Sequence, residues 1–201
     1  HPKDLSDALV AAIADLPTVC EHVHLPLQSG SDAVLAAMRR GYHAEEYLER
    51  VAALRAAVPD VAITTDLIAG FPGESEADFA ATLEVVAAAG FEGAFTFVYS
   101  PRDGTAAATL PGQVPADVRR ERVQRLIALT QELALSSNRR WIGRRAEVLV
   151  EGASRHADGL RGRTRQNVTV NFTGSAEPGA IVEVEIGSAT STTLRGRTAL
   201  S

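Results

Sequence analysis

The sequence predicts an α/β protein in which residues 1–140 form parallel strands alternating with helices and residues 141–201 form a small antiparallel β-barrel. Strand and helix signals alternate up to about residue 115. After Trp141 they give way to short β-rich runs separated by Gly, Asn and Pro. Residues 1–115 carry 16 acidic and 6 basic side chains, whereas residues 116–201 carry 14 arginines and 9 acidic side chains. The two parts are therefore expected to have different partners.

The first part reads as repeated strand–helix units. Helices are predicted at residues 5–16, 31–39, 45–58 and 75–89, and strands at residues 19–25, 61–69 and 94–99. Ser75 is the expected N-cap of the last of these helices, with Asp78 at the capping-box position. Helices of this length between strands favour a parallel sheet, either half of a (β/α) barrel or part of an open sheet.

A long helix is expected to connect the two parts. Residues 101–115 form a loop rich in Pro, Gly and Ala, and an amphipathic helix is predicted from Ala116 to about Arg140. Short strands are then predicted at residues 146–150, 160–163, 168–172, 181–186 and 192–197. Five short strands in so few residues favour a closed barrel of the oligonucleotide-binding type.

Three strand ends run into loops rich in Gly, Ser and Pro: "HVHLPLQSGSD", "TTDLIAGFPGE" and "FVYSPRDGT". In parallel α/β folds, ligands lie at the carboxyl ends of the strands. The turn from Gly70 to Gly73 is expected to cradle a ligand with its bare backbone, and the Ser29 and Ser31 hydroxyls suit a carboxylate or phosphate. The alternative is that Gly and Pro serve only to turn the chain.

Polar residues within the strands are also candidates. Asp66 lies in an apolar strand, where a carboxylate is unfavourable, so a role in a site is expected, with an Arg or amide partner as the alternative. His22 and His24 share one face of a strand. Because no third ligand is evident, a packed or hydrogen-bonded histidine pair is expected, and no metal site is predicted.

The segment "GLRGRTRQNVTVNF" is the candidate RNA-binding region. Three arginines alternate along it, which on one face of a strand matches successive phosphates: Arg161, Arg163 and Arg165. Asn167 and Asn171 are expected to bind base edges, and Phe172 to stack on a base. The alternative is a strand whose outward face is basic and solvated.

Composition excludes several classes. Cys20 is the only cysteine, so the chain alone can form neither an internal disulfide nor a cysteine-ligated cluster. No apolar stretch of about 18 residues is present, which argues against a membrane partner. No secretory signal is recognised, and a cytoplasmic location is expected.

Taken together, "HLPLQSGSD", "MRRGY", "TTDLIAGFPGESEADF", "YSPRDGT" and "GRTRQNVTVNF" resemble the methylthiotransferases of the radical S-adenosylmethionine (SAM) class. The last motif is most similar to bacterial enzymes that methylthiolate N6-isopentenyladenosine next to the anticodon of tRNA. The resemblance implies that residues 1–140 are the C-terminal half of a radical-SAM (β/α) barrel. It also implies that residues 141–201 are a TRAM domain, an RNA-binding β-barrel.

The resemblance further implies cofactors that this chain cannot hold alone. The family uses S-adenosylmethionine and two [4Fe–4S] clusters, and the chain lacks the CxxxCxxC loop and the N-terminal domain that carry the cluster ligands. "HPKDL" resembles the segment after the third barrel strand, so the chain is expected to begin in mid-domain and to be inactive by itself. A half-barrel exposes a sheet edge, so self-association is expected.

The matching motifs assign residues to roles, and the catalytic residues stay unassigned. The residues implied to lie at the cofactor are Gln28, Ser29, Gly30, Arg40, Asp66, Gly70 and Gly73. Tyr99 and Arg102 match the loop on the substrate side, where Asp103 replaces the usual Pro. Alternative substrates are threonylcarbamoyladenosine in tRNA and an aspartate of a ribosomal protein. A further alternative is a non-enzymatic RNA-binding remnant; the Arg-rich barrel favours tRNA as the partner.

Overall fold

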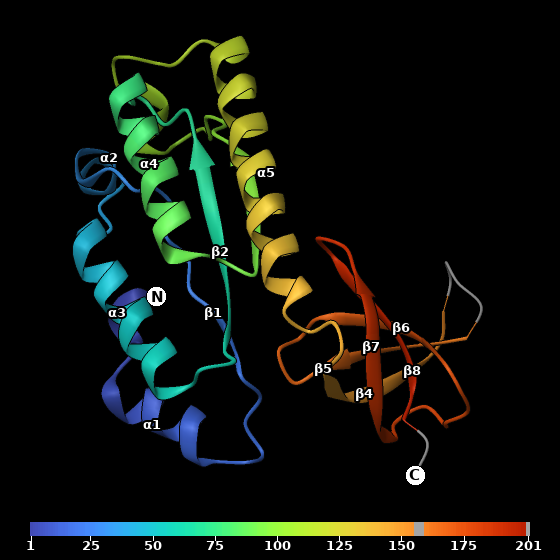
Figure 1. The fold of residues 1–201 in the computed structure, drawn as a ribbon. Helices are drawn as coiled ribbons and strands as arrows, with labels where there is room; N and C mark the ends of the chain where they lie inside the picture. Colours follow the sequence, from blue (N-terminus) through green and yellow to red (C-terminus); the bar gives the residue numbers. More distant parts are fainter. Residues whose placement is uncertain (155–158, 200–201) are drawn as a thin grey trace.

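The computed structural model of the chain describes residues 1–154 and 159–199. Its first part contains one parallel sheet in the order β1-β2-β3, which confirms the predicted α/β organisation. Figure 1 labels β1 and β2 of this sheet. The strands are β1 (His22–His24), β2 (Ala62–Ala69) and β3 (Gly93–Val98). The helices are α1 (Asp7–Asp15), α2 (Asp32–Ala37), α3 (Ala44–Ala57), α4 (Glu76–Ala89) and α5 (Ala116–Arg139), with short 3-10 turns at Pro2–Asp4 and Ala106–Thr109.

The strand β1 is shorter than predicted. It begins at His22, because the amides of Val19 and His22 donate to the nearby carbonyls of Leu16 and Cys20 in local turns, and it ends before Pro26, whose nitrogen cannot donate to a neighbouring strand. The helix α4 begins as predicted, because Ser75 and Asp78 form a reciprocal capping box. It ends at Gly90, whose φ of 62° suits a residue without a side chain.

The helices cover one face of the sheet and leave the other open. Side chains on the covered face of β2, such as Ile63 and Leu67, share one core with residues of α3, α4 and α5. On the opposite face, Asp66 is in register with Phe95, which is 62% exposed. The strands β1 and β3 are the two edges of this sheet, and self-association through an edge stays a prediction.

The second part is a closed barrel with the strand order β4-β5-β6-β8-β7. Its strands are β4 (Arg145–Ala153), β5 (Leu160–Thr164), β6 (Thr169–Thr173), β7 (Ile181–Ala189) and β8 (Thr193–Thr198). All pairs are antiparallel, as predicted, except β6 and β8. The strand β8 follows β7 as a hairpin and lies between β7 and β6, so it runs parallel to β6.

The barrel lies at the end of the sheet where the strands begin (Figure 1). The helix α5 ends at Arg139, and Trp141 already packs in the barrel core, next to the predicted boundary at residue 140. The Asn138 side chain donates to the Thr190 carbonyl at 2.9 Å, which fixes the junction. Within the described residues, no helix has both the length and the apolar character needed to cross a membrane.

Candidate functional site

A cavity of about 610 Å³ lies at the carboxyl ends of the strands. We call it the carboxyl-end cavity. Four residues predicted as site residues come together in its lining, one or more from the end of each strand: Gln28, Asp66, Tyr99 and Arg102. The Gln28 backbone continues the pairing of β1 with β2, since its amide donates to the Asp66 carbonyl at 2.8 Å. This pairing holds Gln28, which has a φ of 70°, beside the cavity.

Asp66 reaches the cavity from the open face of β2. Its side chain is 28% exposed, and its Oδ1 lies 3.5 Å from Nε2 of His24. His24 and His22 both lie within hydrogen-bond distance of the Thr64 hydroxyl, at 3.0 and 3.1 Å, which confirms the expected hydrogen-bonded pair. Burial, with smaller effects from His24 and Arg163, lowers the pKa of the His22 imidazole. The open face therefore presents an imidazole next to the Asp66 carboxylate.

Tyr99 offers an unpaired polar group at the cavity. The residue is 9% exposed, and its hydroxyl has no hydrogen-bond partner in the described part of the chain. Its ring packs edge-to-face on Phe71, with centroids 5.3 Å apart. Tyr99 also lines an adjoining cavity of about 310 Å³, and Arg40 lies in the wall of that second cavity. Buried hydroxyls are usually paired, so Tyr99 is suited to a polar atom of a ligand.

Ser29 and Gly30 face α4 and not the cavity. The Ser29 hydroxyl is buried and lies 3.2 Å from the Thr82 hydroxyl. The Gly30 amide donates to the same oxygen at 3.0 Å, and a Cβ on Gly30 would lie 2.6 Å from the Thr82 Cα. The glycine is therefore required for close packing of this loop on the helix.

At Gly70 the turn after β2 is not a bare cradle, whereas contact of a ligand with Gly73, where an added Cβ would meet no atom within 4 Å, stays a prediction. The Gly70 amide donates to Oε2 of Glu74 at 2.7 Å, and a Cβ on Gly70 would lie 2.1 Å from Cγ of Arg119. The Gly73 amide donates to the Gly112 carbonyl at 2.8 Å. The protein's own side chains and backbone thus occupy both of these amides.

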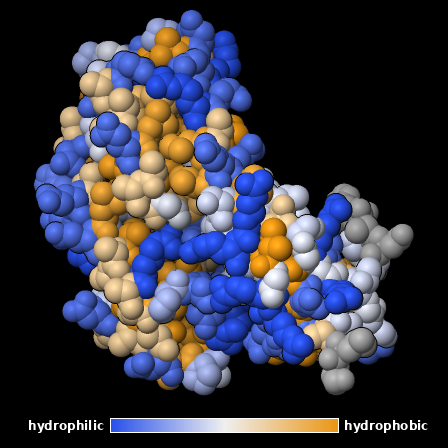
Figure 2. Space-filling model, viewed as in Figure 1, coloured by the Kyte–Doolittle hydropathy of each residue, from blue (hydrophilic) through white to orange (hydrophobic). Residues whose placement is uncertain are grey.

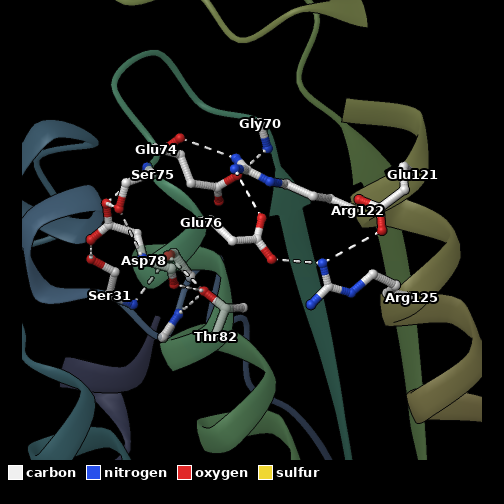
Figure 3. A network of polar contacts seen from close by, with 12 residues as sticks. Ser31, Gly70, Glu74, Ser75, Glu76, Asp78, Thr82, Glu121, Arg122 and Arg125 are labelled. Carbon is white, nitrogen blue, oxygen red and sulfur yellow. Dashed lines mark hydrogen bonds and ion pairs between the residues drawn. The ribbon is translucent and has the colours of Figure 1, made fainter. Parts of the chain in front are cut away.

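A buried ion pair supports this turn (Figure 3). Arg122 of α5 donates to Glu74 at 2.8 Å, and the two side chains are only 5% and 1% exposed. Burial raises the pKa of the Glu74 carboxyl, against the lowering effects of the Gly70 amide and Arg122. Arg119 donates to the Tyr99 carbonyl, so α5 holds the loops that follow both β2 and β3. No sequence signal pointed to these arginines, because their partners are distant in the chain.

The barrel places the predicted RNA-binding residues in different environments. Arg161 and Arg163 lie on the outer face of β5, where both pair with Glu151 at 3.2 and 2.9 Å. Asn167 is exposed, and its side-chain oxygen accepts from Arg163 at 2.9 Å. Phe172 is 2% exposed in the barrel core. The prediction that Phe172 stacks on a base is therefore wrong, because strand alternation directs Phe172 inward.

Arg165 joins the two parts of the chain instead of extending the arginine row. It follows the end of β5, and its guanidinium pairs with Glu21 at 2.8 Å and donates to the Val19 carbonyl at 2.7 Å. Arg144 and Asp60 form a second pair across the junction at 2.6 Å. Figure 2 shows hydrophilic surface gathered where the α/β part meets the barrel. The junction is thus held mainly by polar contacts.

A double-mutant cycle with Glu21→Gln and Arg165→Met is expected to give a coupling free energy of about 1 kcal/mol, since the pair is charged, multiply hydrogen-bonded and partly exposed. Urea unfolding of the four proteins measures it. The control cycle uses Arg161→Met and Glu151→Gln, a more exposed pair within the barrel, and is expected to give less than about 0.5 kcal/mol. Equal coupling in both cycles would refute a junction role for Arg165.

Two family models match the chain. The Radical SAM superfamily model matches residues 2–86, and the TRAM domain model matches residues 139–199. The chain is thus similar to part of a radical SAM domain over residues 2–86 and to a TRAM domain over residues 139–199. This confirms the resemblance on which the domain assignment was based. Gln28 and Asp66 of the carboxyl-end cavity lie within the residues that the Radical SAM model matches, whereas Tyr99 and Arg102 lie beyond them. The arginines of β5 lie within the residues that the TRAM model matches.

Relatives match along both parts. The tRNA-2-methylthio-N(6)-dimethylallyladenosine synthase of Caldicellulosiruptor saccharolyticus is 52% identical over 177 residues, covering 88% of this chain and 38% of the relative. The protein of the same name from Moorella thermoacetica is 50% identical over 198 residues, covering 98% of this chain and 45% of the relative. The chain therefore spans less than half the length of these curated relatives.

A solved structure supports the fold of the radical SAM part. Coproporphyrinogen III oxidase (HemN) from Escherichia coli, described as a radical SAM enzyme, superposes with a TM-score of 0.53 at 18% sequence identity. The match covers 66% of this chain and 31% of the HemN chain. At this identity the likeness concerns the fold alone.

The side chains present fit one of the implied cofactors better than the other. Cys20 is exposed and precedes β1, so it lies at the opposite end of the sheet from the cavity. Within residues 1–154 and 159–199, no group of three or more His, Cys, Asp or Glu side chains could hold a metal ion. These residues do not supply a cluster ligand set. The cavity, with Asp66, Gln28 and the unpaired Tyr99 hydroxyl, suits a nucleoside such as that of S-adenosylmethionine.

Proposed function

We propose that the chain is the C-terminal part of a cytoplasmic tRNA methylthiotransferase that acts on N6-isopentenyladenosine next to the anticodon. The observation that carries this proposal is the joint presence of a radical SAM part and a TRAM domain, each matched by relatives about 50% identical that bear the synthase name. By itself the chain is inactive in this proposal, because Cys20 is its only cysteine.

S-adenosylmethionine, when bound and reduced by one electron from a cluster, would supply the radical of such a reaction, and a second S-adenosylmethionine would supply the methyl group. This chain's residues bind and orient it. The Asp66 carboxylate accepts hydrogen bonds from ribose hydroxyls, and the Gln28 amide can donate and accept. The Tyr99 hydroxyl donates to a polar atom of the ligand, and the exposed Arg102 guanidinium binds a carboxylate or phosphate at the rim of the cavity. The TRAM domain holds the tRNA.

The alternatives differ in substrate or in activity. Threonylcarbamoyladenosine in tRNA keeps the same fold and the same RNA partner. A basic ribosomal protein is disfavoured by the arginines exposed on the TRAM domain, since like charges repel. A non-enzymatic RNA-binding remnant would use the TRAM domain alone.

A chimeric enzyme tests the proposal. The matching C-terminal part of the Moorella thermoacetica synthase is replaced with this chain, and the chimera is expressed in a bacterium that lacks the enzyme. Mass spectrometry of tRNA nucleosides is expected to show 2-methylthio-N6-isopentenyladenosine. Asp66→Asn in the chimera is expected to lower its amount about tenfold or more, as loss of a charged hydrogen bond does.

The control is Asp15→Asn, an exposed position on α1, which is expected to leave the modification level unchanged. Methylthiolation of threonylcarbamoyladenosine alone would reassign the substrate. A soluble chimera that forms neither product would overturn the proposal and support the remnant.

A further inference from the structure

The pentapeptide "LRGRT" occurs twice in the TRAM domain, at residues 160–164 and 194–198. The two copies form β5 and most of β8, and these strands lie on either side of β6. In both copies the central glycine faces inward against a neighbouring strand. A Cβ on Gly162 would lie 2.3 Å from the Leu149 carbonyl oxygen, and one on Gly196 would lie 2.2 Å from that of Glu185. The repeat therefore builds two equivalent strands whose arginines must point outward.

The pairing registers bring these arginines onto one surface. Arg161 of β5 is opposite Asn171 of β6, and Asn171 is opposite Arg195 of β8. Asn171 points outward, because Val170 and Phe172 on either side of it are buried. Residues in register on neighbouring strands share a face. We call the surface formed by Arg161, Arg163, Asn171, Arg195 and Arg197 the arginine face.

The spacing and charge of this face suit a polyanion. Alternate residues along a strand are about 7 Å apart and neighbouring strands about 5 Å apart, so the backbones of Arg161 and Arg195 lie about 10 Å apart across β6. Arg163 and Arg197 are displaced from this row in opposite directions along their strands. Two carboxylates oppose them: Glu151 pairs with Arg161 and Arg163, and Glu185 pairs with Arg197 at 3.1 Å. No carboxylate of the described residues pairs with Arg195. Such exposed pairs are weak, so phosphates can replace the carboxylates.

The face contains no outward aromatic side chain. The outward residues of β6 are Thr169, Asn171 and Thr173, while Phe172 lies in the core. The buried centres of protein–protein interfaces are enriched in aromatic residues, and a base-stacking surface uses aromatic rings. Guanidinium, amide and hydroxyl groups instead match phosphates and ribose 2′-hydroxyls.

We propose that the arginine face binds the sugar–phosphate backbone of RNA, and that Arg195 and Arg197 of β8 are as important as the arginines of β5. The proposal rests on the proposed function for the identity of the partner as RNA. It assigns two RNA-binding residues outside the segment that the sequence singled out. Binding through the backbone predicts strong salt dependence and little preference for base sequence.

The experiment is a fluorescence anisotropy titration of the intact chain with a labelled RNA stem–loop, from about 50 to about 300 mM KCl. Arg195→Ala/Arg197→Ala is compared with Arg120→Ala/Arg139→Ala, which removes the same charge from exposed positions on α5. The first variant is expected to bind about tenfold or more weaker at about 100 mM salt, with a salt slope smaller by about 1.5. The α5 variant is expected to stay within about twofold of the parent.

A third variant, Arg195→Lys/Arg197→Lys, distinguishes loss of RNA contacts from misfolding of the alanine variant. It keeps the charges, so it is expected to retain most of the salt slope while losing the bidentate contacts. If Arg195→Ala/Arg197→Ala bound RNA as tightly as the parent, RNA binding by the arginine face would be overturned. The proposed methylthiotransferase function would be unaffected, since the chimera tests it separately. Absence of RNA binding by the parent chain would also overturn it. If polyglutamate displaced the labelled RNA as well as unlabelled RNA does, the face would bind polyanions in general, and its assignment to RNA would be overturned.

Discussion

Arg122→Met is expected to lower the free energy of unfolding by about 3–5 kcal/mol, because it leaves the buried Glu74 carboxylate without its cation. Urea unfolding followed by far-ultraviolet circular dichroism measures the loss, since most of the helices lie in the radical SAM part. The difference in free energy of unfolding between the parent and the variant is expected to be larger at pH 8 than at pH 5. Burial already raises the pKa of Glu74, and removal of Arg122 raises it further, so the variant gains stability as the carboxyl takes up a proton.

The matched control is Arg125→Met, one turn further along α5. Arg125 pairs with Glu76 at 2.7 Å, but both side chains are exposed, so the expected loss is below about 1 kcal/mol. Glu74→Gln combined with Arg122→Met is expected to recover part of the stability, since neither buried charge then remains. A loss as small for Arg122 as for Arg125 would contradict the importance of the buried pair.

Gly196→Ala is expected to destabilise the TRAM barrel by about 3 kcal/mol. The new Cβ would lie 2.2 Å from the Glu185 carbonyl oxygen and 2.7 Å from Cγ1 of Val184, so the strands β7 and β8 must separate. Trp141 is the only tryptophan of the chain and packs in the barrel core. Its fluorescence during urea unfolding therefore reports on the barrel directly.

Gly187→Ala is the control on the neighbouring strand. The nearest atom to a Cβ there is the Arg195 carbonyl oxygen, at 4.0 Å, so the barrel has room for the methyl group. Its expected effect is within about 0.5 kcal/mol. Similar losses from both substitutions would show that the close contact between β7 and β8 at Gly196 does not set the effect of Gly196→Ala.

The sequence predicted the elements well where local signals determine them. The capping box at Ser75 set the start of α4. A run of apolar and β-branched residues located β2, and β-rich runs separated by Gly, Asn and Pro located the barrel strands. It also identified residues that reach the cavity, such as Asp66, because a carboxylate inside an apolar strand is unusual. These signals depend only on neighbouring residues.

The errors came from contacts between distant segments. Gly70 appeared free to bind a ligand, but Glu74 and Arg119 occupy its surroundings, and Arg119 belongs to a helix far along the chain. Arg165 was predicted to extend an alternating row of arginines, but β5 ends at Thr164 and the Arg165 side chain pairs with Glu21. Phe172 was placed on the wrong side because a strand pattern alone does not tell which face is the core. Tertiary packing decides such cases.

The helix α5 sets the distance between the carboxyl-end cavity and the barrel. It is one uninterrupted helix of 24 residues, anchored near its start by Arg119 and Arg122 at the loops of the cavity, and at its end by Asn138 in the barrel. Its length is about 36 Å at 1.5 Å per residue. Insertion of a single residue would turn the barrel by about 100° about the helix axis. The number of residues in α5 therefore sets both the distance of the barrel from the cavity and the rotation of the barrel about the helix axis.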